Sequence, residues 1–214
     1  MGKTLATLFG MTSKLTSLLR DSITRTTFLR NRHHSLLLFS TSDVVELLKL
    51  AQNKQALLRV EHVIKSRNMV ETISTVEFYC HLLVKGASQI ERNKDCPEEF
   101  KEAISSLIYA SSRIGEFPEL VHIRDYFASR FGKDFVSQIT EFPLYSDVNA
   151  KLVQNLSTRK PSLETRVSYL REIASENGIT LHLDVDSRQE TEKGKPTKLS
   201  RNTLTINQVL TSSG

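Results

Sequence analysis

The residue types in this chain that could do chemistry are two cysteines and a few histidines. Cys80-His81, Cys96 and His62 could be considered as metal ligands, but their spacings match no zinc-site pattern. The sequence also lacks a glycine-rich phosphate loop, a His-Glu-x-x-His pair, a Gly-x-Ser-x-Gly nucleophile and a dinucleotide-binding fingerprint. It therefore predicts no enzyme, no metal and no cofactor, and two unpaired thiols in a reducing compartment. An assembly or adaptor role is favoured.

The positive charge of the chain is concentrated in its first 40 residues. The net charge of the whole chain is +5, and six bases against one acid, Asp21, supply it there. These bases, which we predict to form a face for membrane or another anionic surface, are Lys3, Lys14, Arg20, Arg25, Arg30 and Arg32. Three of them, Lys14, Arg25 and Arg32, fall near one line of a helical wheel. Such a stripe is either a solvated helix face or a surface attracted to lipid head groups or to nucleic-acid phosphates.

The amino-terminal segment permits more than one interpretation. It is rich in Ser, Thr and Arg and nearly free of acids, which is typical of a mitochondrial transit peptide. Leu5, Leu8 and Phe9 have helical spacing, so they could instead lie in a membrane interface or dock onto the core of the domain. The longest purely aliphatic and aromatic run is Leu36 to Phe39, far below the roughly 20 residues of a membrane-spanning helix.

The elements that must position these residues are organised around a stretch from Met11 to Lys85 without glycine or proline. As one helix at ~1.5 Å per residue it would be roughly 110 Å long, whereas a compact chain of this length measures about 45 Å. The helix must therefore reverse. The apolar pattern lapses over 51–55, and Asn53 tolerates a left-handed conformation well. This placement predicts two matched antiparallel arms, about 12–50 and 54–93.

We predict that the turn is formed by Gln52, Asn53 and Lys54. A second location, Ser40 to Asp43, resembles a capping box with Glu46, but it would leave the first arm too short to cover the second.

The second arm carries an apolar seam at coiled-coil spacing, with a change of phase near the turn. The predicted seam residues are Leu57, Val60, Ile64, Met69, Ile73, Val76, Cys80, Leu83 and Ile90.

Shorter helices follow the long arms. Pro97 is suited to the first turn of a helix that ends at Gly115. Pro118 begins the next helix, which stops at Gly132. A continuation follows from Lys133 to Thr140. A short helix is expected over about 148–156, capped by Asp147, and a last one over about 161–176. The all-α fold predicted here has one domain, 1–183, in which shorter helices pack on an antiparallel hairpin, and a disordered polar tail, 184–214.

Seven stretches in this order resemble one protein family, the increased-sodium-tolerance (Ist) family of ESCRT-III-like proteins, in its plant branch. They are Leu57 to Ile64, Glu77 to Cys80, Cys96 through Ala110, Gly115 to Leu120, Arg130 to Phe135, Leu156 to Ser162 and Ile173 to Asn177. The resemblance covers about 1–183.

The resemblance implies an ESCRT-III-like helical hairpin and a role in endosomal sorting and multivesicular-body protein transport. It implies binding to ESCRT-III subunits of the charged-multivesicular-body type, modulation of the AAA ATPase that disassembles ESCRT-III, peripheral membrane contact, and a cytoplasmic location at endosomes. Two of the seven stretches contain the residues that we expect to contact a partner: Arg59, Glu61, His62, Phe117 and Pro118.

Two features depart from the family pattern. The polar tail contains no full amphipathic leucine-arginine-leucine motif of the kind that recruits the ATPase, so direct recruitment is in doubt. The run Leu36 to Phe39 covers all sides of a helix, so at least one of its side chains must be exposed or meet a partner.

Two further functions fit parts of the sequence. A basic helical module that binds nucleic acid is favoured by the charge of the first arm, but that arm lacks aromatic residues on which bases could stack, and no nucleic-acid partner is expected. A mitochondrial helical protein with a cleaved presequence is favoured by the amino-terminal composition alone.

Overall fold

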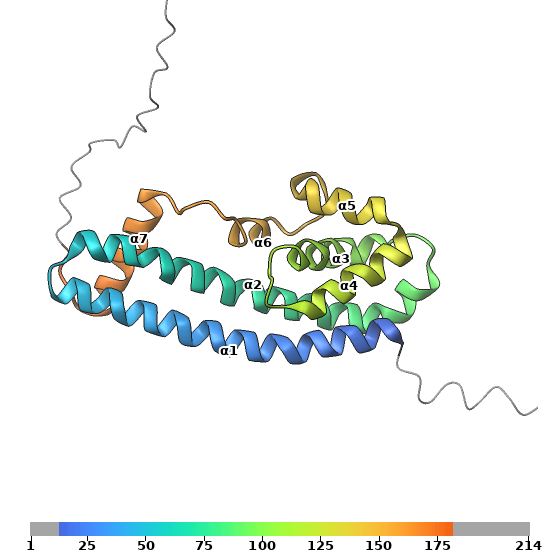
Figure 1. The fold of residues 1–214 in the computed structure, drawn as a ribbon, viewed down its shortest axis with the longest axis horizontal. Helices are drawn as coiled ribbons and strands as arrows, with labels where there is room; N and C mark the ends of the chain where they lie inside the picture. The colour runs from blue at the N-terminus through green and yellow to red at the C-terminus, as the bar shows by residue number, and fades with distance from the viewer. Residues whose placement is uncertain (1–12, 182–214) are drawn as a thin grey trace, which may run out of the picture. The chain divides into compact units, whose positions relative to one another are not determined.

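Two long antiparallel helices form the centre of the structure, a computed structural model that describes residues 13–181 (Figure 1). Helix α1 is Lys14–Lys49 and helix α2 is Asn53–Arg92, 36 and 40 residues long. At ~1.5 Å per residue these helices measure about 54 Å and 60 Å. The hydroxyl of Ser13 accepts a hydrogen bond from the Thr16 N–H and caps α1. The stretch without glycine and proline therefore forms two helices and not one long helix.

The reversal between the arms differs from the predicted turn in one detail. Ala51, not Asn53, adopts the left-handed conformation, with φ 55°, and Asn53 already begins α2. The Gln52 N–H donates to the Leu47 carbonyl at 2.9 Å and the Ala51 N–H donates to the Leu48 carbonyl at 3.0 Å. This pair of bonds is a Schellman motif, in which glycine usually occupies the position of Ala51. Helix α1 runs without a break past Thr41, where the second location for the turn had been considered.

The residues of the predicted seam face the interior of the molecule. All of them are buried except Leu57 and Met69, which are half-buried. The seam residues from Ile73 onward belong to one apolar core that also contains Leu15, Leu19 and Leu29 of α1.

The later helices are α3 (Glu98–Ser111), α4 (Pro118–Phe131), α5 (Lys133–Glu141), α6 (Ala150–Asn155) and α7 (Leu163–Glu176). A single 3-10 turn, η1 (Pro143–Tyr145), lies between α5 and α6. The segment 118–140 is divided at Gly132, where the sequence placed the stop, because Gly132 adopts φ 99°. Helix α6 is shorter than predicted, and its cap is Asn149, not Asp147.

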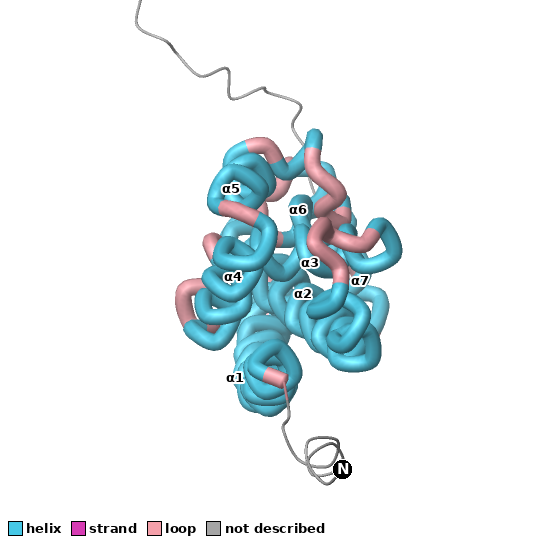
Figure 2. The backbone as a smooth tube through the Cα atoms, turned by 90° about the vertical axis from the view of Figure 1, so that its right-hand side faces the viewer, coloured by secondary structure: helices cyan, strands magenta, loops and turns pink. Residues whose placement is uncertain are grey.

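These helices pack onto different parts of the hairpin. Helix α3 packs against α2, α4 packs against α1 and α3, and α7 packs across α2 and α1 near the turn. Figure 2 shows α4 and α7 on different sides of the hairpin. Helices α2 and α3 approach closely at Gly86, which faces the ring of Phe100.

Helix α7 is held by polar contacts as well as by apolar burial. Arg166 pairs with Glu61 at 3.1 Å, Arg67 pairs with Glu172 at 2.8 Å, and the Arg67 guanidinium lies 4.8 Å from the ring centre of Tyr169. Gly178, with φ 65°, ends the helix as the sequence indicated.

Some sequence expectations lie outside the described residues. These are Lys3, the segment from Leu5 to Phe9, and the tail 184–214. Within 13–181, no helix has the length and apolar character needed to cross a membrane.

Candidate binding surfaces

Three of the four arginines of the first arm do not form the free cationic face that the sequence predicted. Arg25 donates to the Glu116 carbonyl at 2.9 Å and lies 3.8 Å from the Glu119 carboxylate. Arg32 pairs with the Glu116 carboxylate, and Arg30 pairs with Glu77 of α2. The prediction is therefore corrected for these three arginines, because acids distant in sequence neutralise them. Lys14 and Arg20 are exposed.

Glu116, in the turn before α4, joins α1 to α4. Its carboxylate contacts both Arg32 and His33, and its carbonyl accepts from Arg25. The side chain of Glu116 is 28% exposed, so water screens these contacts only in part.

Replacing Glu116 with alanine is expected to lower the free energy of unfolding by about 1–2 kcal/mol, because Arg32 and His33 lose the carboxylate that both of them contact. Urea unfolding followed by circular dichroism measures the change. Glu141→Ala, at an exposed position of α5, serves as the control and should leave the midpoint nearly unchanged. Equal midpoints for the two variants would show that Glu116 does not fasten α4 to α1.

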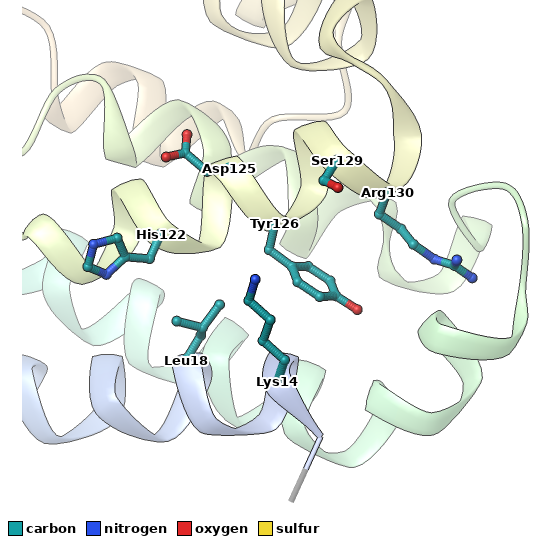
Figure 3. Close-up of a pocket in the computed structure, with 7 residues that line it drawn as sticks. All are labelled: Lys14, Leu18, His122, Asp125, Tyr126, Ser129 and Arg130. Carbon is teal, nitrogen blue, oxygen red and sulfur yellow. The ribbon is translucent and has the colours of Figure 1, made fainter.

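A groove of about 570 Å³ lies between the start of α1 and the second half of α4, and we refer to it as the α1–α4 groove. Lys14 and Leu18 line it from α1, and the α4 residues that line it are His122, Asp125, Tyr126, Ser129 and Arg130. In Figure 3 the Lys14 amine points toward α4, and the Tyr126 ring lies between Lys14 and Arg130. The groove thus has apolar surface from Leu18 and Tyr126 between charged rims.

Arg130 and Tyr126 determine which polar groups this groove offers to a ligand. Arg130 donates to the Glu91 carbonyl at 2.7 Å and so caps the end of α2 while it forms one rim. Burial raises the pKa of Tyr126, and the nearby Glu91 raises it further. The phenol is therefore neutral at physiological pH and can donate a hydrogen bond to a bound chain.

A second groove, of about 470 Å³, lies beside the hairpin turn, and we refer to it as the tip groove. Its lining residues are Leu47, Gln52, Gln55, Leu58, Arg59 and His62. The Arg59 side chain crosses to α1, where its Nε donates to Asp43 at 3.0 Å.

The five residues predicted to contact a partner do not share one surface. Arg59 and His62 line the tip groove, whereas Glu61 is engaged with Arg166 of α7. Phe117 is completely buried, so the expectation that it contacts a partner is wrong; its role is in the core. Pro118 is exposed at the first turn of α4.

The cysteines offer no reactive centre. Burial raises the pKa of Cys80 to about 12 and the pKa of Cys96 to about 11, so neither is a thiolate near neutral pH. No group of three or more potential metal ligands occurs in the described part of the chain.

The residues that α4 contributes to the α1–α4 groove were not singled out from the sequence. A signal was present, since His122, Asp125, Ser129 and Arg130 recur at helical spacing on one polar face of α4. What the pattern could not show is that this face lies beside Lys14.

Comparisons with known proteins agree with the fold. The family model "Ist1: Regulator of Vps4 activity in the MVB pathway" matches residues 16–180. An IST1-like protein of Dictyostelium discoideum is 29% identical over 166 residues, which are 78% of this chain and 44% of that protein. The vacuolar protein sorting-associated protein IST1 of Saccharomyces cerevisiae is 29% identical over 171 residues, which are 76% of this chain and 57% of that protein. The chain thus spans about half the length of these curated relatives.

One solved structure is similar over most of its length. It is the crystal structure of the Saccharomyces cerevisiae Ist1 N-terminal domain in complex with the Did2 MIM motif, with a TM-score of 0.71 and 27% identity. The similarity covers 80% of this chain and 96% of that one.

Proposed function

The chain belongs to the Ist1 family, and from this membership we propose that it acts as a non-enzymatic regulator in the multivesicular-body pathway. It binds ESCRT-III subunits of the charged-multivesicular-body type and modulates the Vps4-type ATPase that disassembles their polymers. It works on the cytoplasmic face of endosomes. The match over 16–180 carries the proposal, because it includes every helix of the structure except the first two residues of α1.

The ligand we propose is a MIM motif, the short amphipathic helix that such a subunit carries. The solved yeast relative holds the MIM motif of Did2. A helix of this kind needs a groove that covers its apolar face and charged rims that pair with its flanks.

The α1–α4 groove is the place proposed for this helix. Leu18 and Tyr126 provide apolar surface, while Lys14 and Arg130 provide cations for acidic residues of the helix. It is the larger of the two grooves described above, and α1 and α4 line it from two sides.

The experiment measures binding of fluorescently labelled MIM peptides to the full chain by anisotropy. Wild type is expected to bind at least one such peptide. A double variant, Lys14→Glu with Ser129→Trp, is expected to bind at least about tenfold more weakly, because it reverses one rim and fills the groove. Both positions are exposed, so the fold should persist. Lys49→Glu, a charge reversal at an exposed position near the turn, is the matched control.

The outcomes separate the function from its location. If wild type binds none of the peptides, the proposed function is contradicted. If wild type binds and the double variant binds equally well, the function stands and the α1–α4 groove is not its site. The isolated microtubule-interacting-and-transport domain of the ATPase is tested beside the peptides. Its binding shows whether the chain also recruits the ATPase directly.

A further inference from the structure

The α1–α4 groove opens beside the point where the chain enters α1. Lys14, the first residue of α1, lines the groove, and Leu18 lies one turn further along. The Lys14 amine points toward α4, from which the Tyr126 ring extends beside it (Figure 3). Within residues 13–181, neither this amine nor the Tyr126 hydroxyl has a hydrogen-bond partner. The groove therefore offers apolar surface and two unused donors to its occupant.

The residues that precede α1 have a composition that matches this groove. Leu8 and Phe9 follow Leu5 by three and four positions, so on a helix the three share one face. Residues 4–9, which we refer to as the amino-terminal segment, carry no charge. The last carbonyls of a helix have no partner within it, so they accept hydrogen bonds from nearby donors. The segment thus supplies an apolar face and free acceptors where the groove supplies apolar surface and donors.

The connection to α1 is short enough to keep the amino-terminal segment at the groove. Residues 10–12 join Phe9 to Ser13, so the Cα atoms of these two residues lie at most about 14 Å apart. The part of α4 that lines the groove, 122–130, is about 12 Å long. Gly10 permits the chain to reverse, because glycine adopts positive φ without a steric penalty. The segment can therefore reach the groove of its own chain.

We propose that the amino-terminal segment docks into the α1–α4 groove and competes there with the MIM helix. The competition rests on the proposed function, whereas the docking does not. A connection of three residues gives the segment a local concentration on the order of millimolar, so weak contacts suffice to fill the groove for part of the time. A MIM helix then binds only the fraction of grooves that are free, which weakens its apparent affinity. The segment thereby sets how tightly the chain holds this partner.

Tryptophan fluorescence of the full chain tests the docking without any partner. The chain contains no tryptophan, so Phe9→Trp places a single probe in the amino-terminal segment. Its emission is expected at the shorter wavelengths of a buried indole. Adding Ser129→Phe, which fills the groove from an exposed position of α4, should shift the emission to that of an indole in water. Adding Glu141→Phe, at an exposed position outside the groove, is the matched control and should leave the emission unchanged.

Two results of the fluorescence experiment would overturn the docking. One is a Phe9→Trp probe that emits like an indole in water, and the other is a buried emission that Ser129→Phe leaves unchanged. Vesicles that contain phosphatidylserine are added in a separate measurement. An exposed probe that becomes buried only with these vesicles would show that the amino-terminal segment binds membrane instead of the groove.

The competition is measured by anisotropy with the labelled MIM peptides. A triple variant, Leu5→Ser with Leu8→Ser and Phe9→Ser, removes the apolar face and is expected to bind at least about threefold more tightly than wild type. The control, Ala6→Ser with Thr7→Ser, changes the other side of the amino-terminal segment and should bind like wild type. Unchanged or weaker binding by the triple variant would contradict the competition. A wild type that binds no peptide contradicts the proposed function, and the fluorescence experiment still decides the docking.

Discussion

Replacing Phe117 with alanine is expected to lower the free energy of unfolding by about 3–5 kcal/mol, the largest change proposed for a single residue. The ring is completely buried at the turn before α4 and belongs to the main core. Truncation removes this ring from the core and leaves a cavity between helices that cannot fully collapse. Urea or thermal unfolding followed by circular dichroism measures the loss.

Phe39→Ala is the matched control for this prediction, because the Phe39 ring is 72% exposed. Its free energy of unfolding should stay within about 0.5 kcal/mol of wild type. A stable Phe117→Ala variant that bound MIM peptides poorly would instead support the expectation from the sequence that Phe117 contacts a partner.

Replacing Gly86 with alanine is expected to cost about 1–3 kcal/mol, although alanine is normally the better helix former by about 1 kcal/mol. A Cβ at this position would lie 2.6 Å and 2.7 Å from the two Cε atoms of Phe100. The ring cannot move aside easily, because Phe100 is buried between α2 and α3. The clash therefore outweighs the gain in helix propensity.

A second substitution identifies the cause. Phe100→Leu shortens the side chain opposite Gly86, so the double variant should recover part of the loss, and a double-mutant cycle gives the coupling. Gly115→Ala is the control, because no atom lies within 4 Å of a Cβ built there. If Gly86→Ala proved neutral or stabilising, the close approach of α2 and α3 would be contradicted.

The hairpin could be predicted from the sequence because its signals are local. An unbroken stretch without glycine or proline and an apolar seam depend only on neighbouring positions. The left-handed residue was assigned to Asn53 instead of Ala51 because alanine gives no sign of that conformation. The helix cap at this point is made by backbone bonds, which any residue can form.

The binding surfaces could not be predicted in the same way, because they depend on contacts between distant segments. Nothing near Arg25 or Arg32 in the sequence indicates that Glu116 will pair with them. The α1–α4 groove likewise joins Lys14 to residues more than a hundred positions away. Phe117 is a different case. It lies in one of the stretches that resemble the family, and we expected it to contact a partner at the surface, but it is buried in the core.

The middle of α1 has a mechanical consequence. Between Leu29 and Val44 no side chain of this helix is fully buried, while α4 contacts α1 on one side of that interval and α7 packs near the turn on the other. The contacts of α1 with α4 and its contacts with α7 are therefore separated by a section of α1 without fully buried side chains. Because few buried apolar contacts mean low local stability, this section of α1 is where the hairpin is expected to open most easily.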